Sequence, residues 1–280
     1  MCGFVAAFSF NGSSFDHEKV IEMANVISHR GPDDQGTYKA DWFSMVFNRL
    51  SIIDTSMSGH QPMVITDSLS GNKFVCIFNG EIYNFEYLRV KLQEHGYSFS
   101  TDSDTEVLIY SYLMWGEKCV EQFNGMFSFI IVDLSKNSVF AARDHLGIKP
   151  LYFAYIEETL FFVSEIKALS LFNDFSLNKN KVLEQIAHRY IPGKETIFNE
   201  VKRVLPGSYV KFKKDGELNH NIYYDVSKSI ESSNKNKINR NIEYPKIANL
   251  LNKSIIDHTR SDVGFNVQLS GGVDSSYIVS

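Results

Sequence analysis

The second residue of the chain, Cys2, carries the group best suited to covalent chemistry. Met1 is readily removed when a small residue follows it, and the mature chain then begins with a cysteine that has both a thiol and a free α-amine. An α-amine titrates near pH ~8 and a thiol near ~8.5, so the amine can accept the thiol proton. The resulting thiolate attacks amide carbonyls. Position alone also fits an ordinary N-terminal residue.

A second group of polar residues follows a predicted strand. The apolar run 74–78 is predicted to form this strand, and it leads directly into Asn79, Gly80 and Glu81. Glycine lets the backbone approach a ligand closely, and the asparagine side chain offers a hydrogen-bond donor. An amide, a glycine and a carboxylate in succession are therefore suited to building a site.

Two further polar stretches interrupt the apolar pattern. Residues 29–34, His-Arg-Gly-Pro-Asp-Asp, are predicted as a loop that is either a simple turn or part of a pocket. Residues 103–106, Ser-Asp-Thr-Glu, resemble a capping box that opens a helix over 107–115. The pattern alone favours a capping role for Asp104.

A glycine-rich stretch near the end of the sequence, residues 270–276, reads Ser-Gly-Gly-Val-Asp-Ser-Ser and follows a predicted strand over 265–269. Such a turn before a helix directs backbone N–H groups and the positive helix end toward one point, which suits phosphate oxygens. No lysine follows the glycines, so this is not the phosphate loop of the common NTPases. A Gly-Gly pair alone is more often only a turn, whereas the complete sequence is more specific.

Composition limits the kinds of protein that this chain can be. With 280 residues, 44% of them hydrophobic, the chain is long enough for one large domain or two modest ones with a sizeable core. A net charge of −5 without a long basic run gives no electrostatic case for nucleic acid or a membrane surface. No apolar stretch approaches the ~18–20 residues that span a bilayer, and no signal peptide is evident, so we expect a cytoplasmic protein.

The cysteines and histidines do not predict a metal site. Cys2, Cys76 and Cys119 cannot all pair and lack CxxC spacing, which fits a reducing compartment and argues against structural zinc. The eight histidines are scattered without HxxxH spacing. We therefore expect no metal site formed by these residues.

The order of predicted elements indicates an α+β fold with mainly antiparallel sheets covered by helices. Strands are predicted over 3–10, 42–50, 74–78, 127–133, 138–143, 151–155, 160–163 and 209–213. Helices are predicted over 16–28, 85–95, 107–115 and 178–188, with Asn84 as a candidate cap. We divide the chain into residues 1–225, a polar linker over 226–243, and residues 244–280, which begin with a helix over 244–259.

Taken in order, these sequences resemble the glutamine-dependent asparagine synthetase family. The resemblance extends over nearly the whole chain, through Cys2 and residues 29–33, 49–54, 79–84, 103–106, 125–127, 143–152, 164–169 and 269–276. It implies a four-layer αββα sandwich of the N-terminal-nucleophile hydrolase type, a class II glutamine amidotransferase domain that hydrolyses glutamine. The start of an α/β pyrophosphate-loop domain, which uses ATP to adenylate a carboxylate, would follow.

The resemblance also implies roles for individual residues. Cys2 would be the nucleophile, Asn79 and the N–H of Gly80 the oxyanion hole, and Arg49 the partner of the glutamine α-carboxylate. Glu81 and Asp104 would hold the α-ammonium group. Ile52 would also contact glutamine. The ATP-binding residues would be Leu269, Ser270, Gly271, Gly272, Asp274 and Ser275, with Mg²⁺ sharing the phosphate charge; the glutaminase half would need no cofactor.

The implied partners are glutamine, ATP and a carboxylate acceptor such as aspartate, with a homodimer as one assembly to consider. Because the chain stops just after the pyrophosphate loop, we expect it to hydrolyse glutamine at most and to pack poorly from about residue 244 onward. An amidotransferase acting on a sugar uronic acid shares the same glutaminase half. The phosphoribosyl-pyrophosphate and hexosamine amidotransferases lack the loop over 270–276.

Two alternatives belong to other classes. A non-catalytic domain that senses glutamine would keep the fold without turnover, which the intact set of polar residues disfavours. A cysteine protease would need a histidine beside Cys2, and nothing in the sequence indicates one.

Overall fold

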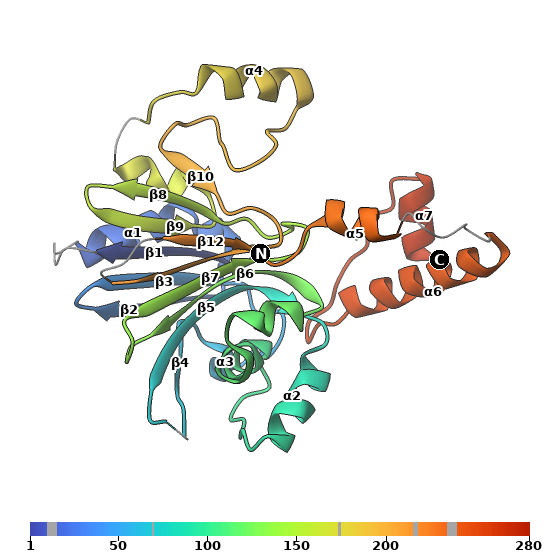
Figure 1. The fold of residues 1–280 in the computed structure, drawn as a ribbon, viewed down its shortest axis with the longest axis horizontal. Coiled ribbons are helices and arrows are strands. Elements are labelled where there is room, and N and C mark those ends of the chain that lie inside the picture. The colour runs from blue at the N-terminus through green and yellow to red at the C-terminus, as the bar shows by residue number, and fades with distance from the viewer. Residues whose placement is uncertain (10–15, 69, 173–174, 215–217, 234–239) are drawn as a thin grey trace.

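Two six-stranded antiparallel sheets form the body of the molecule, which we describe from a computed structural model (Figure 1). The structure describes residues 1–9, 16–68, 70–172, 175–214, 218–233 and 240–280. The first sheet has the strand order β10-β8-β9-β1-β3-β2. Its strands are β1 (Gly3–Ser9), β2 (Asp34–Ala40), β3 (Phe43–Arg49), β8 (Tyr152–Ile156), β9 (Thr159–Val163) and β10 (Val201–Arg203).

The second sheet has the order β12-β11-β7-β6-β5-β4. Its strands are β4 (Met63–Thr66), β5 (Lys73–Ile82), β6 (Gly125–Asp133), β7 (Ser138–Arg143), β11 (Ser208–Lys213) and β12 (Asn219–Ile222). The helices are α1 (His17–Val26), α2 (Phe85–Glu94), α3 (Asp104–Trp115), α4 (Lys179–His188), α5 (Val226–Ser233), α6 (Arg240–His258) and α7 (Val273–Val279).

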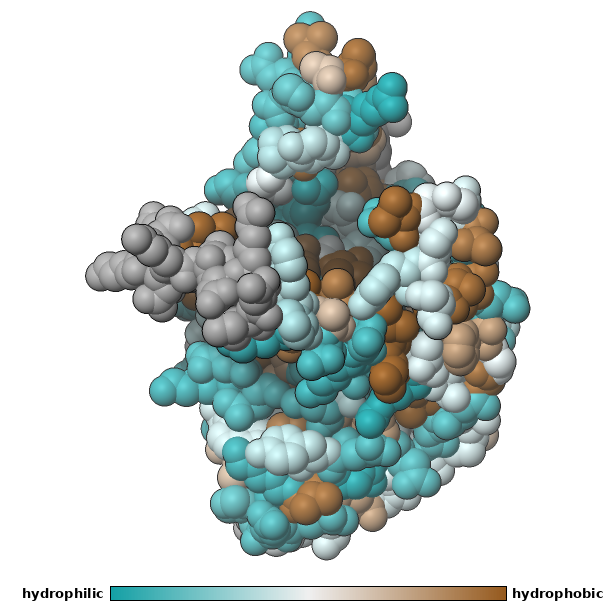
Figure 2. Space-filling model, turned by 90° about the vertical axis from the view of Figure 1, so that its right-hand side faces the viewer, coloured by the Kyte–Doolittle hydropathy of each residue, from teal (hydrophilic) through white to brown (hydrophobic). Residues whose placement is uncertain are grey.

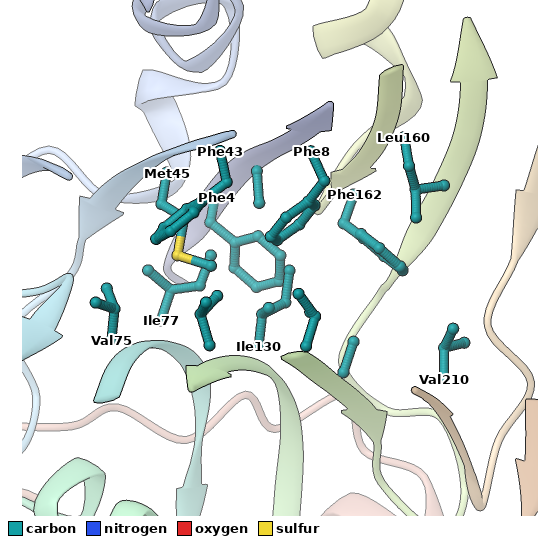
Figure 3. Close-up of a cluster of buried hydrophobic side chains, with 14 of the residues drawn as sticks. Phe4, Phe8, Phe43, Met45, Val75, Ile77, Ile130, Leu160, Phe162 and Val210 are labelled. Atoms are coloured by element: carbon teal, nitrogen blue, oxygen red, sulfur yellow. The ribbon is translucent and has the colours of Figure 1, made fainter. Parts of the chain in front are cut away.

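The main core lies between the two sheets (Figure 3). Phe8 of β1 packs against Phe43 and Phe162 within its own sheet and against Phe212 of the opposite sheet, at a centroid distance of 5.3 Å. Two outer cores bury the other sheet faces, one under α1 and the other under α2 and α3. Because both faces of β1 are covered, all seven of its residues are buried, which explains its continuous apolar sequence.

The main strands agree with the sequence prediction, but four strands were missed. These are β2, β10, β4 and β12, which are the edge strands of the two sheets. An edge strand pairs on one side only, and β2 and β12 also expose many of their residues, so their sequences lack a strong apolar pattern. Strands β4 and β10 have only four and three residues, which is too short for a clear alternation. The hairpin predicted around Glu157 and Glu158 is present between β8 and β9.

Strand β5 is longer than predicted. Asn79, Gly80 and Glu81 do not follow the strand but belong to it, because they pair with Ser128, Phe127 and Met126 of β6. Backbone pairing on β6 therefore continues through the polar residues and fixes their positions.

Two predicted helix caps are corrected. Asn84 precedes α2 but makes no side-chain cap, because its amide bonds the backbone of Gln122 and Asn124 instead. Ser103 caps α3 by accepting from Thr105 N, yet Glu106 does not complete a capping box. The Glu106 carboxylate accepts hydrogen bonds from residues 100 and 101 instead.

The last part of the chain also differs from prediction. Helix α5 occupies the first half of the stretch that we predicted as a linker, while residues 234–239 lie outside the described residues. Residues 265–269 do not form a strand, because no described strand pairs with them. Helices α5, α6 and α7 lie outside the sandwich (Figure 1). Among the described residues, no helix is long and apolar enough to cross a membrane.

Candidate functional site

A polar pocket lies at the start of β1, where the ends of β3 and β5 and the start of α3 meet. Its cavity volume is about 60 Å³. It is lined by Met1, Cys2, Arg49, Leu50, Ile52, Ile53, Gly59, Gln61, Phe78, Asn79, Gly80, Glu81, Ser103, Asp104, Thr105 and Lys149. Met1 is part of the lining, so removal of Met1 enlarges the space in front of Cys2.

Strand β1 and its neighbours hold Cys2 in place. The Sγ atom lies 3.3 Å from the amide nitrogen of Leu50, which donates to it, and 3.5 Å from the Leu50 carbonyl. The Cys2 carbonyl accepts from Arg30 Nε at 2.8 Å. A Cβ at Gly3 would lie 2.8 Å from Arg30 Cδ, so this approach needs the glycine.

Burial dominates the acid–base behaviour of this thiol. Loss of solvation raises the pKa of Cys2, whereas the Leu50 N–H and the positive charges of Lys149 and Arg49 oppose that rise. A thiol whose pKa is raised is mostly protonated near neutral pH, so the nucleophile needs a base to remove its proton.

Arg49 ends β3 and is 5% exposed. Its guanidinium donates to the carbonyls of Ser56, at 2.8 Å, and of Asp54. A Cβ at Gly59 would overlap the guanidinium, so the loop folds closely around it. These contacts use only part of the donor set of an arginine, and the side chain also lines the pocket.

Asn79 and Gly80 present hydrogen-bond donors to the pocket. The Asn79 Nδ2 is buried and has no hydrogen-bond partner among the described residues. Leaving a buried amide donor unsatisfied costs about 1–3 kcal/mol, so such a donor indicates a ligand. Gly80 packs closely on β6, because a Cβ there would overlap the Met126 carbonyl.

Two carboxylates lie on the same side of the pocket. Glu81 is 8% exposed and Asp104 is 5% exposed, and Asp104 Oδ2 accepts from the N–H of Ile82 at 3.1 Å. Burial, followed by repulsion from Glu81, raises the pKa of Asp104 to about 7. Burial also raises the pKa of Glu81, against the opposing charge of Lys149. A bound cation would restore both charged forms.

The structure therefore brings together all the residues that we predicted to bind or attack glutamine, which lie between positions 2 and 104 of the sequence. Cys2, Arg49, Ile52, Asn79, Gly80, Glu81 and Asp104 all line this one pocket. Their segments are far apart in the sequence, and sheet pairing between β1, β3, β5 and β6 aligns them.

The predicted ATP-binding residues lie elsewhere, at the exposed start of α7. The hydroxyl of Ser275 accepts from Ser270 N at 3.3 Å, and Gly271 has a φ of +80°, which favours glycine. Gly272 precedes α7, and because glycine has no side chain it cannot cap the first N–H groups of this helix. Leu269 and Asp274 are exposed.

Gln61 and Lys149 are among the pocket residues that sequence analysis missed. Gln61 accepts from the N–H of Phe78 at 2.6 Å and donates to Thr105 Oγ1 at 3.2 Å, so it joins β5 to the start of α3. Lys149 is 6% exposed and lines the same pocket. Both lie in loops that the sequence marks only as polar, and no spacing rule connects either residue to Cys2.

The segment after α6 contacts the rim of the pocket. Asp262 donates its N–H to the Ile52 carbonyl at 2.9 Å, and its carboxylate accepts from Asp54 N at 2.7 Å. Arg260 donates to the Tyr83 carbonyl at 2.9 Å and pairs with Glu86 at 3.0 Å.

A sandwich of two antiparallel sheets between helices, with a cysteine at the start of a central strand, is the architecture of the N-terminal-nucleophile hydrolases. One solved structure that resembles it is the glutamine phosphoribosylpyrophosphate amidotransferase from Bacillus subtilis complexed with ADP and GMP, with a TM-score of 0.59 and 16% identity. The match covers 79% of this chain and 49% of that one, and at this identity it shows the fold alone. The predicted fold class is thereby confirmed.

The family of the chain follows from its sequence. A family described as a glutamine amidotransferase domain matches residues 1–224, and one described as asparagine synthase matches residues 246–280. The chain belongs to the glutamine amidotransferase domain family.

Its relatives include glutamine-hydrolysing asparagine synthetases. "Asparagine synthetase [glutamine-hydrolyzing] 1" of Bacillus subtilis is 36% identical over 284 residues, and the match covers 100% of this chain and 43% of that protein. "Asparagine synthetase B [glutamine-hydrolyzing]" of Escherichia coli is 32% identical, with 99% and 44% covered. The chain thus spans less than half the length of these relatives, to which it is similar from end to end.

Proposed function

We propose that this chain is the glutamine-hydrolysing part of an asparagine synthetase-type amidotransferase. The observation that carries the proposal is the Asn79 Nδ2, a buried donor without a described partner in the pocket that also holds the Cys2 thiol. A guanidinium and two carboxylates line the same pocket, which matches the charges of an α-amino acid. The similarity to glutamine-hydrolysing asparagine synthetases supports the same activity.

The first half of the reaction forms a thioester. After Met1 is removed, the α-amine of Cys2 accepts the thiol proton, and Sγ attacks the side-chain carboxamide carbon of glutamine. The Asn79 amide and the N–H of Gly80 donate to the oxygen on which negative charge develops. Removing one such donor from an oxyanion hole typically slows a reaction by ~10²–10³.

The second half regenerates the thiol. The tetrahedral intermediate collapses as the carbon–nitrogen bond breaks, and the protonated α-amine gives its proton to the departing nitrogen, which leaves as ammonia. Water, deprotonated by the α-amine, then attacks the thioester. Its collapse releases glutamate and returns a proton to Cys2.

Charge complementarity positions the substrate. Arg49 holds the α-carboxylate with the donors that the loop carbonyls leave for it, because a guanidinium suits a carboxylate geometrically. Glu81 and Asp104 hold the α-ammonium group, which favours their charged forms. Ile52 contacts the substrate at the rim of the pocket.

In the whole protein, ammonia then reaches an ATP-activated carboxylate, for which we propose aspartate. Residues 269–275 bind the pyrophosphate part of ATP, supported by the start of α7, which has no side-chain cap and whose flanking residues are exposed, and by the match to the asparagine synthase family. When bound with ATP, Mg²⁺ would supply positive charge to the phosphates. The three free cysteines support a cytoplasmic location.

Glutamate release by the wild-type chain and by Cys2→Ala tests the proposal. We expect hydrolysis by the wild type and a loss of at least about a thousandfold in Cys2→Ala. Cys119→Ala, which removes a thiol buried in an outer core, is the matched control and should keep most of the rate. Equal rates in wild type and Cys2→Ala would reject a catalytic role for this cysteine. Turnover by a protein that mass spectrometry shows to retain Met1 would reject the α-amine of Cys2 as the proton acceptor.

A further inference from the structure

Lys149 has no assigned role, yet it lies inside the pocket. It belongs to the loop between β7 and β8, is only 6% exposed, and lines the same cavity as Cys2 and Glu81. Within the described residues, its ammonium group makes no hydrogen bond or ion pair. Burying a lysine costs free energy that an apolar residue would not, so its charge calls for an explanation.

The fold holds the backbone of Lys149 from two sides. The carboxylate of Asp144 accepts from four N–H groups, those of Phe127, Leu146, Ile148 and Lys149, at 2.9 to 3.1 Å. The guanidinium of Arg143 donates to the carbonyls of Lys149 and Gly147, each at 2.7 Å, and of Val204 at 2.8 Å. Two buried charged side chains therefore fix the loop that places Lys149 in the pocket.

Charged groups surround the reacting end of the chain on every side. They are the amino terminus itself, Arg30 after α1, Asp33 in the next loop, Arg49 of β3, Glu81 of β5, Asp104 of α3 and Lys149. Arg30 is paired with Glu165 at 3.0 Å and also bonds the Cys2 carbonyl.

Bound substrate keeps the charges of the pocket in balance. In the proposed function the substrate carboxylate neutralises Arg49, and the substrate ammonium neutralises one of the two carboxylates, Glu81 or Asp104. The other carboxylate balances Lys149, whose charge also acts on Cys2.

We propose that the positive charge of Lys149 acts through Cys2, as a positioning residue that promotes loss of the proton shared by the thiol and the α-amine. The inference rests on the proposed function and deepens it. A nearby cation disfavours the protonated amine and favours the thiolate, so it promotes proton loss whichever of the two groups carries the proton. The direction of the effect therefore does not depend on assigning the proton to one atom.

The pKa directions at this end of the chain agree with this role. Burial lowers the pKa of the Met1 amino group, which lies here before Met1 is removed, and the charges of Arg30 and Lys149 lower it further, against the effect of Cys2. Burial raises the pKa of Cys2, while Lys149 is among the charges that oppose the rise.

The pH dependence of glutamine hydrolysis tests the proposal through Lys149→Met and Lys149→Arg. In the profile of kcat/KM against pH, Lys149→Met should move the acidic limb to higher pH by about one unit. At pH values below the limb this shift lowers kcat/KM about tenfold, and on the plateau it changes kcat/KM little. Lys149→Arg keeps the charge and should retain the wild-type limb. Lys136→Met, at a lysine 68% exposed on the surface, is the matched control.

Alkylation of Cys2 by iodoacetamide, followed by mass spectrometry without glutamine, gives a readout that needs no turnover. The other two cysteines are fully buried, so the reagent reports on Cys2. Its pH dependence should shift upward in Lys149→Met and in Lys149→Gln, but not in Lys149→Arg. Circular dichroism checks that each variant is folded.

The outcomes separate this inference from the proposed function. If Cys2-dependent hydrolysis is found and the profiles of wild type and Lys149→Met coincide, the role of Lys149 is rejected and the function stands. If no hydrolysis is found but the alkylation profile shifts, the charge effect stands and the function is rejected. A shifted profile in Lys149→Arg would also reject the inference, because it would show that something other than charge is required.

Discussion

The carboxylate of Asp104 is buried beside a second carboxylate, and this arrangement makes it sensitive to pH. Its pKa of about 7 in the folded chain is above the ordinary value of 3.8. Between these two values the unfolded chain releases the proton first, so the folding free energy becomes less favourable as the pH rises through this window. Below the ordinary value both states are protonated, and the penalty disappears.

Asp104→Asn should therefore stabilise the protein above pH ~7 and change it little below pH ~4. Asparagine can still accept from the Ile82 N–H but carries no charge. We expect the melting temperature to rise by roughly 5 °C at the higher pH, measured by calorimetry across the range. Asp41→Asn, at an exposed carboxylate, is the control. An equal change at both pH values would contradict the assignment, whereas loss of glutamine turnover in Asp104→Asn would agree with its proposed role.

The residues of the pocket were predictable where their sequence context was specific. The sequence around Cys2 and around residues 79–81 identified the groups that now line one cavity. Gln61 was missed because its contribution arises from hydrogen bonds to residues distant in the sequence, such as the backbone of Phe78. Lys149 was missed because its side chain lines the pocket and, among the described residues, makes no hydrogen bond that a motif could indicate. Sequence pattern carries no information on which loop residue turns inward.

At the scale of elements, the loop after β3 connects the pocket to the segment after α6. The carbonyls of Asp54 and Ser56 hold Arg49, while Asp262 holds Asp54 N and the Ile52 carbonyl. The guanidinium that we propose to bind substrate is thus supported indirectly by a residue more than two hundred positions away.

Asp262→Ala should weaken glutamine binding by loosening this loop. A charge-assisted hydrogen bond at an exposed position is worth about 1 kcal/mol, which corresponds to roughly a fivefold rise in KM for glutamine with little change in kcat. Steady-state kinetics of glutamate release measure both constants. Asp257→Ala, near the end of α6 and bonded to Asn124 instead, is the control. An unchanged KM would show that the loop holds its position without Asp262.

The secondary structure also shows which elements a sequence specifies poorly. Central strands such as β1 and β6 bury nearly every side chain, and their apolar runs were recognised. All four missed strands are edges, and every residue of β12 is exposed. Strands β2 and β12 lack an apolar pattern, while β4 and β10 are too short for one to be recognised, so local sequence could not predict their pairing.

At the scale of the whole molecule, the sandwich and the last segments differ in packing. The side chains of residues 244–280 are mostly exposed, including Ile247, Leu250 and Phe265. A broad hollow in this region is lined largely by apolar residues such as Leu251, Ile255 and Ile278. The face of the molecule that includes α5 to α7 shows this apolar surface in brown (Figure 2).

Backbone amides of α6 and α7 should therefore exchange with solvent faster than those of β1 and β6. Few buried apolar contacts lower the free energy of local opening, whereas the central strands open only with the sandwich. Hydrogen exchange with mass spectrometry measures both regions in one experiment, and the peptides of the central strands are the internal control. Equal protection of both regions would contradict the packing described here.

The position of β1 has a practical consequence for anyone producing this protein. Strand β1 lies in the middle of its sheet, between β9 and β3. The residues just before it, Met1 and Cys2, line the pocket. A purification tag placed before Cys2 would have to leave through the pocket that we propose binds glutamine, and it would also turn the proposed free amine of Cys2 into a peptide bond. Cloning strategies should place tags elsewhere or use a protease that leaves cysteine as the first residue.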